Sequence, residues 1–340
     1  MAKILIIRFS SIGDIIQCMS VTSGIRQKFP HDELHWVARR DMAPLLRIDP
    51  NITRIWELDR KSGLKGLLNL AFELRRQGFT HVYDAHSNIR SSIYKLVICP
   101  LSALFGFGSP LLVTRHKHRV KRMMLFSFGI NRFPKPFRAF KSFQKPLEKW
   151  RIHQFPINSK TWHFDAGLLE KVKMLMDYQP GRQLTALVPS AAWELKRWPV
   201  AYWQAVVAQS SDRYFVVLGG PDDHFCADIA GVAPNRVINL AGKTSLLESF
   251  AAIYLSDYVI SGDTGFLHAA DLFGKPGMAI IGPTAFGFPT GPQIKVMEVD
   301  LPCRPCTKDG STRCRIAEKR KCLMDIRPEL VVAQMKATMR

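Results

Sequence analysis

The first fourteen residues constrain the fold more than any other stretch of this chain. An apolar run at residues 3–7 is too short for a helix, and it stops at polar residues and a glycine that precede Asp14. This pattern predicts a buried strand, a tight turn and a helix over 15–29 that ends before Pro30. Ligands of an open α/β sheet bind outside the carboxyl ends of its strands, so Asp14 is a candidate for chemistry. The alternative is that Asp14 only caps the helix.

The same alternation of short apolar runs and helical patterns recurs along the chain. Further strands are predicted at 33–38, 54–58, 81–84, 184–190, 214–220, 236–240, 258–261 and 277–283. Helices are predicted between them at 41–48, 64–77, 199–211, 245–255 and 265–273. Strands separated by helices indicate parallel βαβ units, and 340 residues suit two domains, each with a doubly wound sheet. Residues 131–158, with four prolines among phenylalanines and basic residues, predict a linker, and a membrane-interface segment is the alternative.

The charge of the chain limits its partners. The formal net charge is +20, and no Asp or Glu occurs between Ala85 and Leu147. Such a surface favours an acidic partner, which can be a nucleic acid, an anionic lipid or an anionic glycan. Neither a signal peptide nor an apolar run of the roughly 20 residues that span a membrane is found, so we expect a cytoplasmic protein.

A second candidate site follows the predicted strand at 258–261. Asp263, Thr264 and Gly265 begin a helix there, and the N–H groups of a helix start bind phosphate, while an aspartate can accept hydrogen bonds from sugar hydroxyls. Lys196 follows another strand and precedes a helix begun by proline, where a cation meets a diphosphate. His268 contacts a phosphate or is an ordinary helix histidine. No Gly-x-Gly-x-x-Gly follows a predicted strand, which argues against a dinucleotide oxidoreductase.

Together, these segments resemble glycosyltransferase family 9, the ADP-heptose:lipopolysaccharide heptosyltransferases of Gram-negative bacteria. The resemblance runs from Met1 to about Met335, and its motifs are residues 7–14, 196–199, 262–270, 282–284 and the late cysteines. It implies the GT-B fold, in which two doubly wound Rossmann-like α/β domains face each other across a crevice. We therefore expect an acceptor-binding domain at 1–160 with a linker at about 131–160, a nucleotide-sugar-binding domain at 161–320, and a C-terminal helix at 321–340 that packs back on the N-terminal domain.

The resemblance also assigns roles to residues. Asp14 matches the proposed catalytic base of the family. The donor-binding positions are Lys196, Arg197, Thr244, Asp263, Thr264, Gly265, His268 and Thr284. The acceptor-binding positions are Ser10, Ser11, Arg60, Lys61, Lys65, Asn88 and Arg90. Two departures, Ala191-Ala192 in place of a Thr-Thr pair and Ala285-Phe286 in place of Asp-Pro, leave the identity of the donor open.

The family's reaction is an inverting transfer that needs no cofactor and no catalytic metal. Four cysteines lie within twenty residues and could hold a structural zinc, remain reduced thiols or form a disulfide: Cys303, Cys306, Cys314 and Cys322. The implied partners are an ADP-sugar donor and the anionic inner core of lipopolysaccharide, with peripheral contact at the inner face of the inner membrane and no nucleic acid. The alternatives are another sugar donor or glycan acceptor within the family, and a basic nucleic-acid-binding protein.

Overall fold

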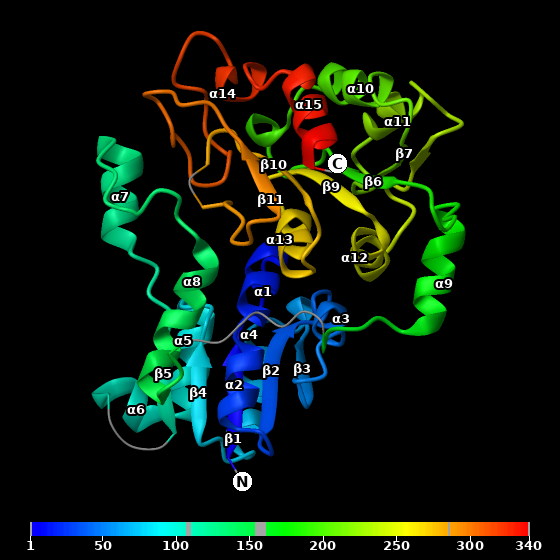
Figure 1. Ribbon diagram of the computed structural model, residues 1–340. Coiled ribbons are helices and arrows are strands. Elements are labelled where there is room, and N and C mark those ends of the chain that lie inside the picture. The colour runs from blue at the N-terminus through cyan, green and yellow to red at the C-terminus, as the bar shows by residue number, and fades with distance from the viewer. Residues whose placement is uncertain (1, 107–109, 154–160, 285, 339–340) are drawn as a thin grey trace. The chain divides into compact units, whose positions relative to one another are not determined.

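Two compact α/β units make up the chain (Figure 1). The computed structural model describes residues 2–106, 110–153, 161–284 and 286–338. Unit 1 comprises Met1–Lys117 and Phe140–His163, and unit 2 comprises His118–Ala139 and Phe164–Arg340. This division differs from the expected boundary at residue 160, because the chain passes into unit 2 at His118 and returns to unit 1 at Phe140 before it leaves again.

The sheet of unit 1 is parallel throughout and has the order β3-β2-β1-β4-β5. Its strands are β1 (Lys3–Ile7), β2 (Glu33–Arg39), β3 (Arg54–Leu58), β4 (His81–Asp84) and β5 (Leu111–Thr114). The apolar run of β1 is buried in the centre of this sheet, as its composition predicts. In the register, Ile7 lies opposite both Val37 and Asp84, so the turn before Asp14 and the end of β4 share one edge.

Helices pack on this sheet in the doubly wound manner. They are α1 (Ile12–Met19), α2 (Thr22–Lys28), α3 (Ala43–Leu46), α4 (Gly63–Arg75), α5 (Ile89–Ile98), α6 (Pro100–Phe105) and α8 (Ala139–Gln144), with 3₁₀ turns η1 (Arg60–Ser62) and η2 (Lys145–Trp150). The single helix expected over 15–29 is two helices. The buried Thr22 hydroxyl lies 2.8 Å from the Met19 carbonyl oxygen and 2.6 Å from the Asp49 carboxylate. At the break between the helices, a side-chain hydroxyl therefore bonds to a carbonyl group at the end of α1.

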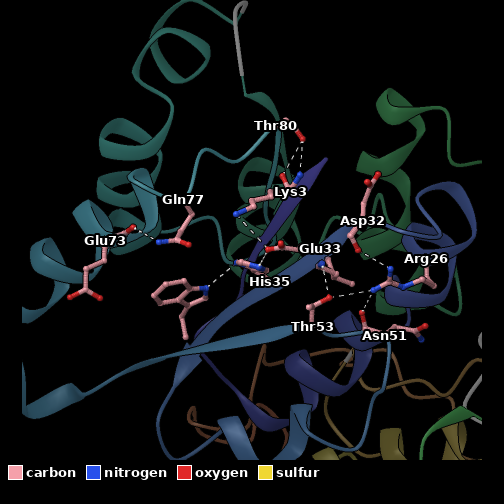
Figure 2. Close-up of polar contacts among 12 residues, drawn as sticks. Lys3, Arg26, Asp32, Glu33, His35, Asn51, Thr53, Glu73, Gln77 and Thr80 are labelled. Atoms are coloured by element: carbon pink, nitrogen blue, oxygen red, sulfur yellow. Dashed lines mark hydrogen bonds and ion pairs between the residues drawn. The ribbon is translucent and has the colours of Figure 1, made fainter. Parts of the chain in front are cut away.

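Polar contacts fix the amino-terminal end of this sheet (Figure 2). The Thr80 hydroxyl accepts a hydrogen bond of 3.2 Å from the Lys3 amide. Trp56 Nε1 donates to Nδ1 of the buried His35 at 3.2 Å, which leaves Nε2 of His35 to donate to Glu33 at 2.9 Å. Burial lowers the pKa of His35, because the charged imidazolium is less well solvated there than the neutral ring.

The segment expected as a linker at 131–160 is divided between the units. Phe143 and Leu147 are fully buried, and the Tyr83 hydroxyl donates to the Phe143 carbonyl oxygen at 2.7 Å. Residues 140–153 therefore belong to unit 1, and the part of the expected linker at 154–160 lies outside the described residues. Of the aromatic side chains that suggested a surface excursion, Phe140 and Phe143 are buried in unit 1, and the following turn η2 contacts β5.

Unit 2 holds a parallel sheet of order β11-β10-β9-β6-β7-β8. Its strands are β6 (Leu184–Val188), β7 (Tyr214–Val217), β8 (Val237–Asn239), β9 (Tyr258–Gly262), β10 (Gly277–Ile280) and β11 (Ile294–Met297). The helices of this unit are α7 (Arg119–Phe128), α9 (Ala166–Leu175), α10 (Val200–Ala208), α11 (Cys226–Ala230), α12 (Leu246–Leu255), α13 (Gly265–Leu272), α14 (Lys321–Met324) and α15 (Pro328–Thr338), with the 3₁₀ turn η4 (Glu194–Lys196). The expected pair of doubly wound α/β sheets is thus confirmed.

The C-terminal helix packs within unit 2, not on the N-terminal domain as expected. Val331 and Met335 of α15 are fully buried in the core of unit 2, and α15 contacts α10 and β10. Trp198 Nε1 donates to the Ile326 carbonyl oxygen at 3.0 Å and joins the helix to the start of α10. The apolar face of α15 therefore completes its own sheet. Among the described residues, every helix is too short or too polar to cross a bilayer.

Candidate active site

Asp14 lies in the first turn of α1, directly beyond the carboxyl end of β1. Its carboxylate forms an ion pair with Arg8, and its Oδ1 lies 3.3 Å from Nη1 of Arg115. The Ser11 hydroxyl donates to Asp14 Oδ2 at 3.1 Å. We call these four residues the Asp14 cluster. Ser11 precedes the helix as its N-cap, so the turn after β1 aims the carboxylate at the two guanidinium groups.

The two arginines are buried, whereas Asp14 is partly open. Their side chains are 4% and 5% exposed, against 36% for Asp14. Arg8 Nη1 donates to the Ala85 carbonyl oxygen at 2.9 Å, and Arg115 Nε donates to Ser142 Oγ at 3.1 Å. The Arg115 guanidinium also lies 3.5 Å from the centre of the Phe143 ring. Both cations are therefore held in place by contacts other than Asp14.

This arrangement keeps Asp14 ionised. Desolvation would raise the pKa of its carboxyl group, but the charges of Arg8 and Arg115, with hydrogen bonds from Arg115 and Ser11, outweigh burial and lower that pKa well below its usual range. The positive charge of Arg8 also affects two neighbouring groups, Lys117 and His86. Burial and the positive charge of Arg8 lower the pKa of Lys117 to about 8 and that of His86 to about 3. The Asp14 carboxylate is thus surrounded by positively charged groups.

Asp84 organises the neighbouring loop from the end of β4. Its fully buried carboxylate accepts hydrogen bonds from the amides of His86 and Ser87 at 3.0 and 2.7 Å, and Lys95 lies 3.0 Å away. Asn88 caps α5, because its Oδ1 accepts from the Ser91 amide at 2.9 Å. Asn88, predicted to bind the acceptor, therefore has a structural contact as a helix cap.

The remaining acceptor candidates lie on exposed elements of unit 1. Arg60 and Lys61 are on η1, Lys65 is in the first turns of α4, and all three are exposed, as is Arg90 on α5. Within the part of the chain that the structure describes, Ser11 alone of the predicted acceptor residues, which also include Ser10, has a recorded contact with Asp14. Their role in binding an acceptor stays a prediction.

Lys196 and Asp263 meet at the carboxyl edge of the sheet of unit 2. Lys196 ends η4 after β6, Asp263 follows β9, and these adjacent strands form the switch point of the sheet, from which the chain winds in both directions. Lys196 Nζ lies 2.9 Å from Asp263 Oδ2, and the Thr284 hydroxyl donates to the same oxygen at 2.6 Å. We call these residues the Lys196 cluster. Burial opposes the ionisation of Asp263, but Lys196 and Thr284 prevail and lower the pKa of the carboxyl group.

The helix start beside Asp263 has the geometry expected of an anion site. Thr264 is the N-cap of α13, and Gly265 is its first residue, so the first N–H groups of α13 lack helical partners. His268 lies one turn further on and is 6% exposed. A Cβ added to Gly287 would lie 1.9 Å from Asp263 Oδ1, and one added to Gly310 would lie 2.8 Å from Lys196 Cγ. Only glycine therefore lets these two loops approach the cluster.

Arg197 and Thr244, both predicted to bind the donor, make contacts elsewhere. Arg197 Nε donates to the Ala191 carbonyl oxygen at 2.8 Å, and its Nη2 lies 3.4 Å from Asp223. The 3₁₀ turn that directs Lys196 toward Asp263 directs the next side chain away from it. The Thr244 hydroxyl lies 2.8 Å from Ser249 Oγ at the start of α12. These contacts stabilise the local fold and leave Lys196 as the cation next to Asp263.

A cavity adjoins the Lys196 cluster within unit 2. It measures about 450 Å³, and Thr284 lines it together with Phe133, Phe137, Glu298 and Arg304. Residues from 131–137 thus form one wall, although the sequence pattern there indicates only a linker. A cavity with aromatic walls and a few polar groups is typical of a small-molecule site.

The four late cysteines are free thiols in this structure. Burial raises the pKa of Cys322 to about 11 and also raises that of Cys306, so both thiols are protonated at neutral pH when no metal is bound. Within the described ranges, no group of three or more His, Cys, Asp or Glu side chains could hold a metal ion. The expectation of a structural zinc therefore has no support from this arrangement.

Three basic residues in or beside the Asp14 cluster, Arg8, Arg115 and Lys117, were missed as site residues. Arg115 and Lys117 stand in a long basic run that does not distinguish them, and they reach Asp14 only through strand pairing of β4 with β5. Arg8 offered a signal, since a basic residue at the end of a fully apolar strand needs a buried partner. A short-range pattern does not identify that partner.

Comparison with known proteins agrees with this picture. The sequence profile of glycosyltransferase family 9 (heptosyltransferase) matches residues 67–316. The chain is 26% identical over 292 residues to a lipopolysaccharide core heptosyltransferase, OpsX, of Haemophilus influenzae, across 84% of this chain and 79% of the relative. The profile match includes the Lys196 cluster and the basic segment after β5.

Solved structures have the same fold. A glycosyl transferase of family 9 from Veillonella parvula superposes with a TM-score of 0.76 at 19% identity, covering 99% of this chain and 97% of the other. The ADP-heptose lipopolysaccharide heptosyltransferase II of E. coli superposes with a TM-score of 0.71 at 19% identity, covering 99% and 98%. At this identity, the likeness establishes the fold.

Proposed function

This chain belongs to glycosyltransferase family 9, and on that premise we propose that it transfers heptose from ADP-heptose to the inner core of lipopolysaccharide. The observation that carries the proposal is the ionised carboxylate of Asp14, which lies beyond the carboxyl end of β1 and is paired with Arg8 and Arg115. The names of its relatives support the choice of donor and acceptor: one is a lipopolysaccharide core heptosyltransferase, and another is an ADP-heptose heptosyltransferase.

Asp14 acts as the general base in this proposal. It accepts the proton of the acceptor hydroxyl while that oxygen attacks the anomeric carbon from the face opposite ADP, so the configuration inverts. A carboxylate held by two arginines is ionised but weakly basic. The anionic groups of an inner-core acceptor near Arg8, Arg115 or Lys117 would offset their charge, which raises the basicity of Asp14 when the acceptor is present.

The Lys196 cluster binds the donor in the same proposal. Negative charge develops on the departing diphosphate, and Lys196 with the start of α13 is placed to stabilise it without a metal ion. Asp263 orients Lys196 through the contact of 2.9 Å, and Thr284 fixes Asp263. We propose inverting, metal-independent transfer on this basis, with no cofactor.

The acceptor of such a reaction is a lipid. We therefore propose that the protein acts in the cytoplasm, in peripheral contact with the inner face of the inner membrane. The net charge of +20 supports attraction to anionic headgroups and to the phosphates of the inner core.

A donor panel tests the proposal. Purified protein is incubated with ADP-heptose, UDP-, GDP- or CMP-sugars and a core-truncated lipopolysaccharide acceptor, and products are analysed by mass spectrometry and by NMR of the new glycosidic linkage. We expect transfer from ADP-heptose alone, inversion at the anomeric carbon and no loss of rate with a chelator. Transfer from another nucleotide sugar, or retention of configuration, would contradict the assignment.

A further inference from the structure

Helix α7 has two different apolar faces. One packs inward: Leu125 is buried against Phe133, and the Arg122 guanidinium lies 4.5 Å from the centre of the Phe286 ring. Arg315 Nη2 also donates to the Phe126 carbonyl oxygen at 2.7 Å and holds the helix to the rest of unit 2. These contacts hold α7 to unit 2 through its inner face.

The outer face of α7 exposes large apolar side chains. Val120, Met123 and Phe128 are 66%, 54% and 69% exposed, and Ile130, directly after the helix, is 47% exposed. Val120 and Met123 are three residues apart and lie on one side of the helix. A single exposed apolar residue is ordinary, but here four large exposed apolar residues fall within the eleven residues 120–130. We call this set the outer face of α7.

Basic residues flank this surface. Arg119 and Lys121 are exposed on the first turn, and no ion pair with either is recorded among the described residues. The helix contains no acidic residue, and neither does the whole stretch from Ala85 to Leu147. Helix α6 also exposes apolar residues, Leu101 and Leu104, but it carries no basic residue. Exposed apolar area and uncompensated positive charge thus coincide on α7.

We propose that the outer face of α7 is the element that docks this protein on an anionic lipid bilayer. A helix with apolar side chains on one side and Lys or Arg beside them lies in the plane of the headgroups, with the apolar side chains among the upper acyl chains. The basic side chains then meet the phosphates of anionic lipids, each contributing about fivefold to binding. This inference rests on the proposed function, because a lipid acceptor would require the protein to reach a membrane. The docking surface itself is inferred from the exposed side chains of α7.

Vesicle flotation tests the docking surface. The full chain is mixed with vesicles of phosphatidylcholine, with or without phosphatidylglycerol, and the bound fraction is measured over a range of lipid concentrations. We expect salt-sensitive binding to the anionic vesicles and at least tenfold weaker binding to the neutral ones. The double variant Arg119→Glu/Lys121→Glu should bind at least 25-fold more weakly, about fivefold for each basic residue. Met123→Ser/Phe128→Ser should bind roughly tenfold more weakly, since less apolar area is buried in the bilayer.

Matched controls separate docking from general effects. Met174→Ser changes a methionine on α9 that is even more exposed, at 76%, and Lys336→Glu reverses an exposed lysine on α15. Both should bind the anionic vesicles within twofold of the parent chain, and all variants should unfold at the parent's denaturant midpoint. Equal loss of binding in the controls, or parental binding by both α7 variants, overturns the inference.

A soluble acceptor keeps the two proposals apart. With a delipidated inner-core oligosaccharide, the α7 variants should transfer heptose at the parental rate, because the outer face of α7 contains no residue of the Asp14 or Lys196 cluster. With lipid-embedded acceptor, their rate should fall along with vesicle binding. An equal fall with both acceptors overturns the docking role, whereas absence of transfer by the parent chain itself refutes the proposed function and leaves the flotation result standing.

Discussion

Replacement of Asp14 by asparagine separates catalysis from charge balance in the Asp14 cluster. Asp14→Asn keeps the size of the side chain and one oxygen that can accept from Arg115 or Ser11, but it removes the basic site. Loss of a positioned general base lowers a rate by typically 10²- to 10⁴-fold, which is about 3–5 kcal/mol of barrier. We therefore expect the single-turnover rate to fall within or beyond this range, with unchanged affinity for ADP-heptose, because the proposed donor-binding residues lie in unit 2.

The same substitution also affects stability. Arg8 and Arg115 are almost fully buried and would lose their counterion, and breaking a buried ion pair costs about 3–5 kcal/mol. Since the Asp14 side chain is 36% exposed and both arginines keep other hydrogen bonds, we reduce this to about 1–3 kcal/mol. Urea unfolding measures this loss, and the rate assay is run well below the unfolding temperature so that folded protein is compared.

Ser11→Ala is the matched control for this experiment. It removes only the hydrogen bond of 3.1 Å to Asp14 and leaves the carboxylate and both arginines, so we expect the rate to fall by less than tenfold. The reasoning is refuted if folded Asp14→Asn protein turns over within tenfold of the parent chain. It is also refuted if the fall in rate is matched by an equal loss of donor affinity.

Three further predictions concern other groups. Lys196→Met should weaken ADP binding by about tenfold to 100-fold in calorimetry, the worth of one charged hydrogen bond, and unchanged affinity would contradict its role. Because burial lowers the pKa of His35, the unfolded state takes up a proton below pH 6.5 that the folded state does not. The free energy of unfolding should therefore fall as the pH drops from about 7 to 5, by at most about 1.4 kcal/mol per pH unit. His35→Gln should flatten that slope in urea titrations, and a parental slope would count against the assignment. Burial would raise the pKa of Cys314, but backbone hydrogen bonds outweigh it and lower that pKa, whereas burial keeps Cys322 protonated. Cys314 should therefore react with a maleimide at pH 8 much faster than Cys322. Equal rates in peptide mapping would show that burial does not protect Cys322.

The predicted strands include every interior strand of both sheets and also the edge strands β3 and β8. β1 and β9 are buried along nearly their whole length, so an unbroken apolar run was a sufficient signal. The strands that were missed, β5 and β11, lie at sheet edges, are four residues long and contain one buried residue each. Residues 140–150 were misread for a similar reason, since prolines and lysines surround the few side chains that enter the core.

The candidate site was predictable where it depends on local chain direction. Asp14 and Asp263 both follow a strand and begin a helix, which places them at the carboxyl edges of their sheets. The pairing of Asp14 with Arg115 joins residues 101 positions apart and depends on strand order, which local patterns do not encode. The chain also changes direction where the 3₁₀ turn ends at Lys196 and Arg197 becomes extended, so Lys196 reaches Asp263 whereas Arg197 contacts Ala191 and Asp223.

The path of the chain between the units determines how the protein can be divided. Three covalent crossings join the units, at residues 117–118, 139–140 and 163–164. A fragment ending near residue 160 would carry α7 and residues 131–137 away from Phe286 and from the cavity beside Thr284, and the complementary fragment would lack one wall of that cavity. No single cut therefore yields two intact halves, and studies of either half by itself require deletion of the 118–139 excursion from one fragment and its grafting onto the other.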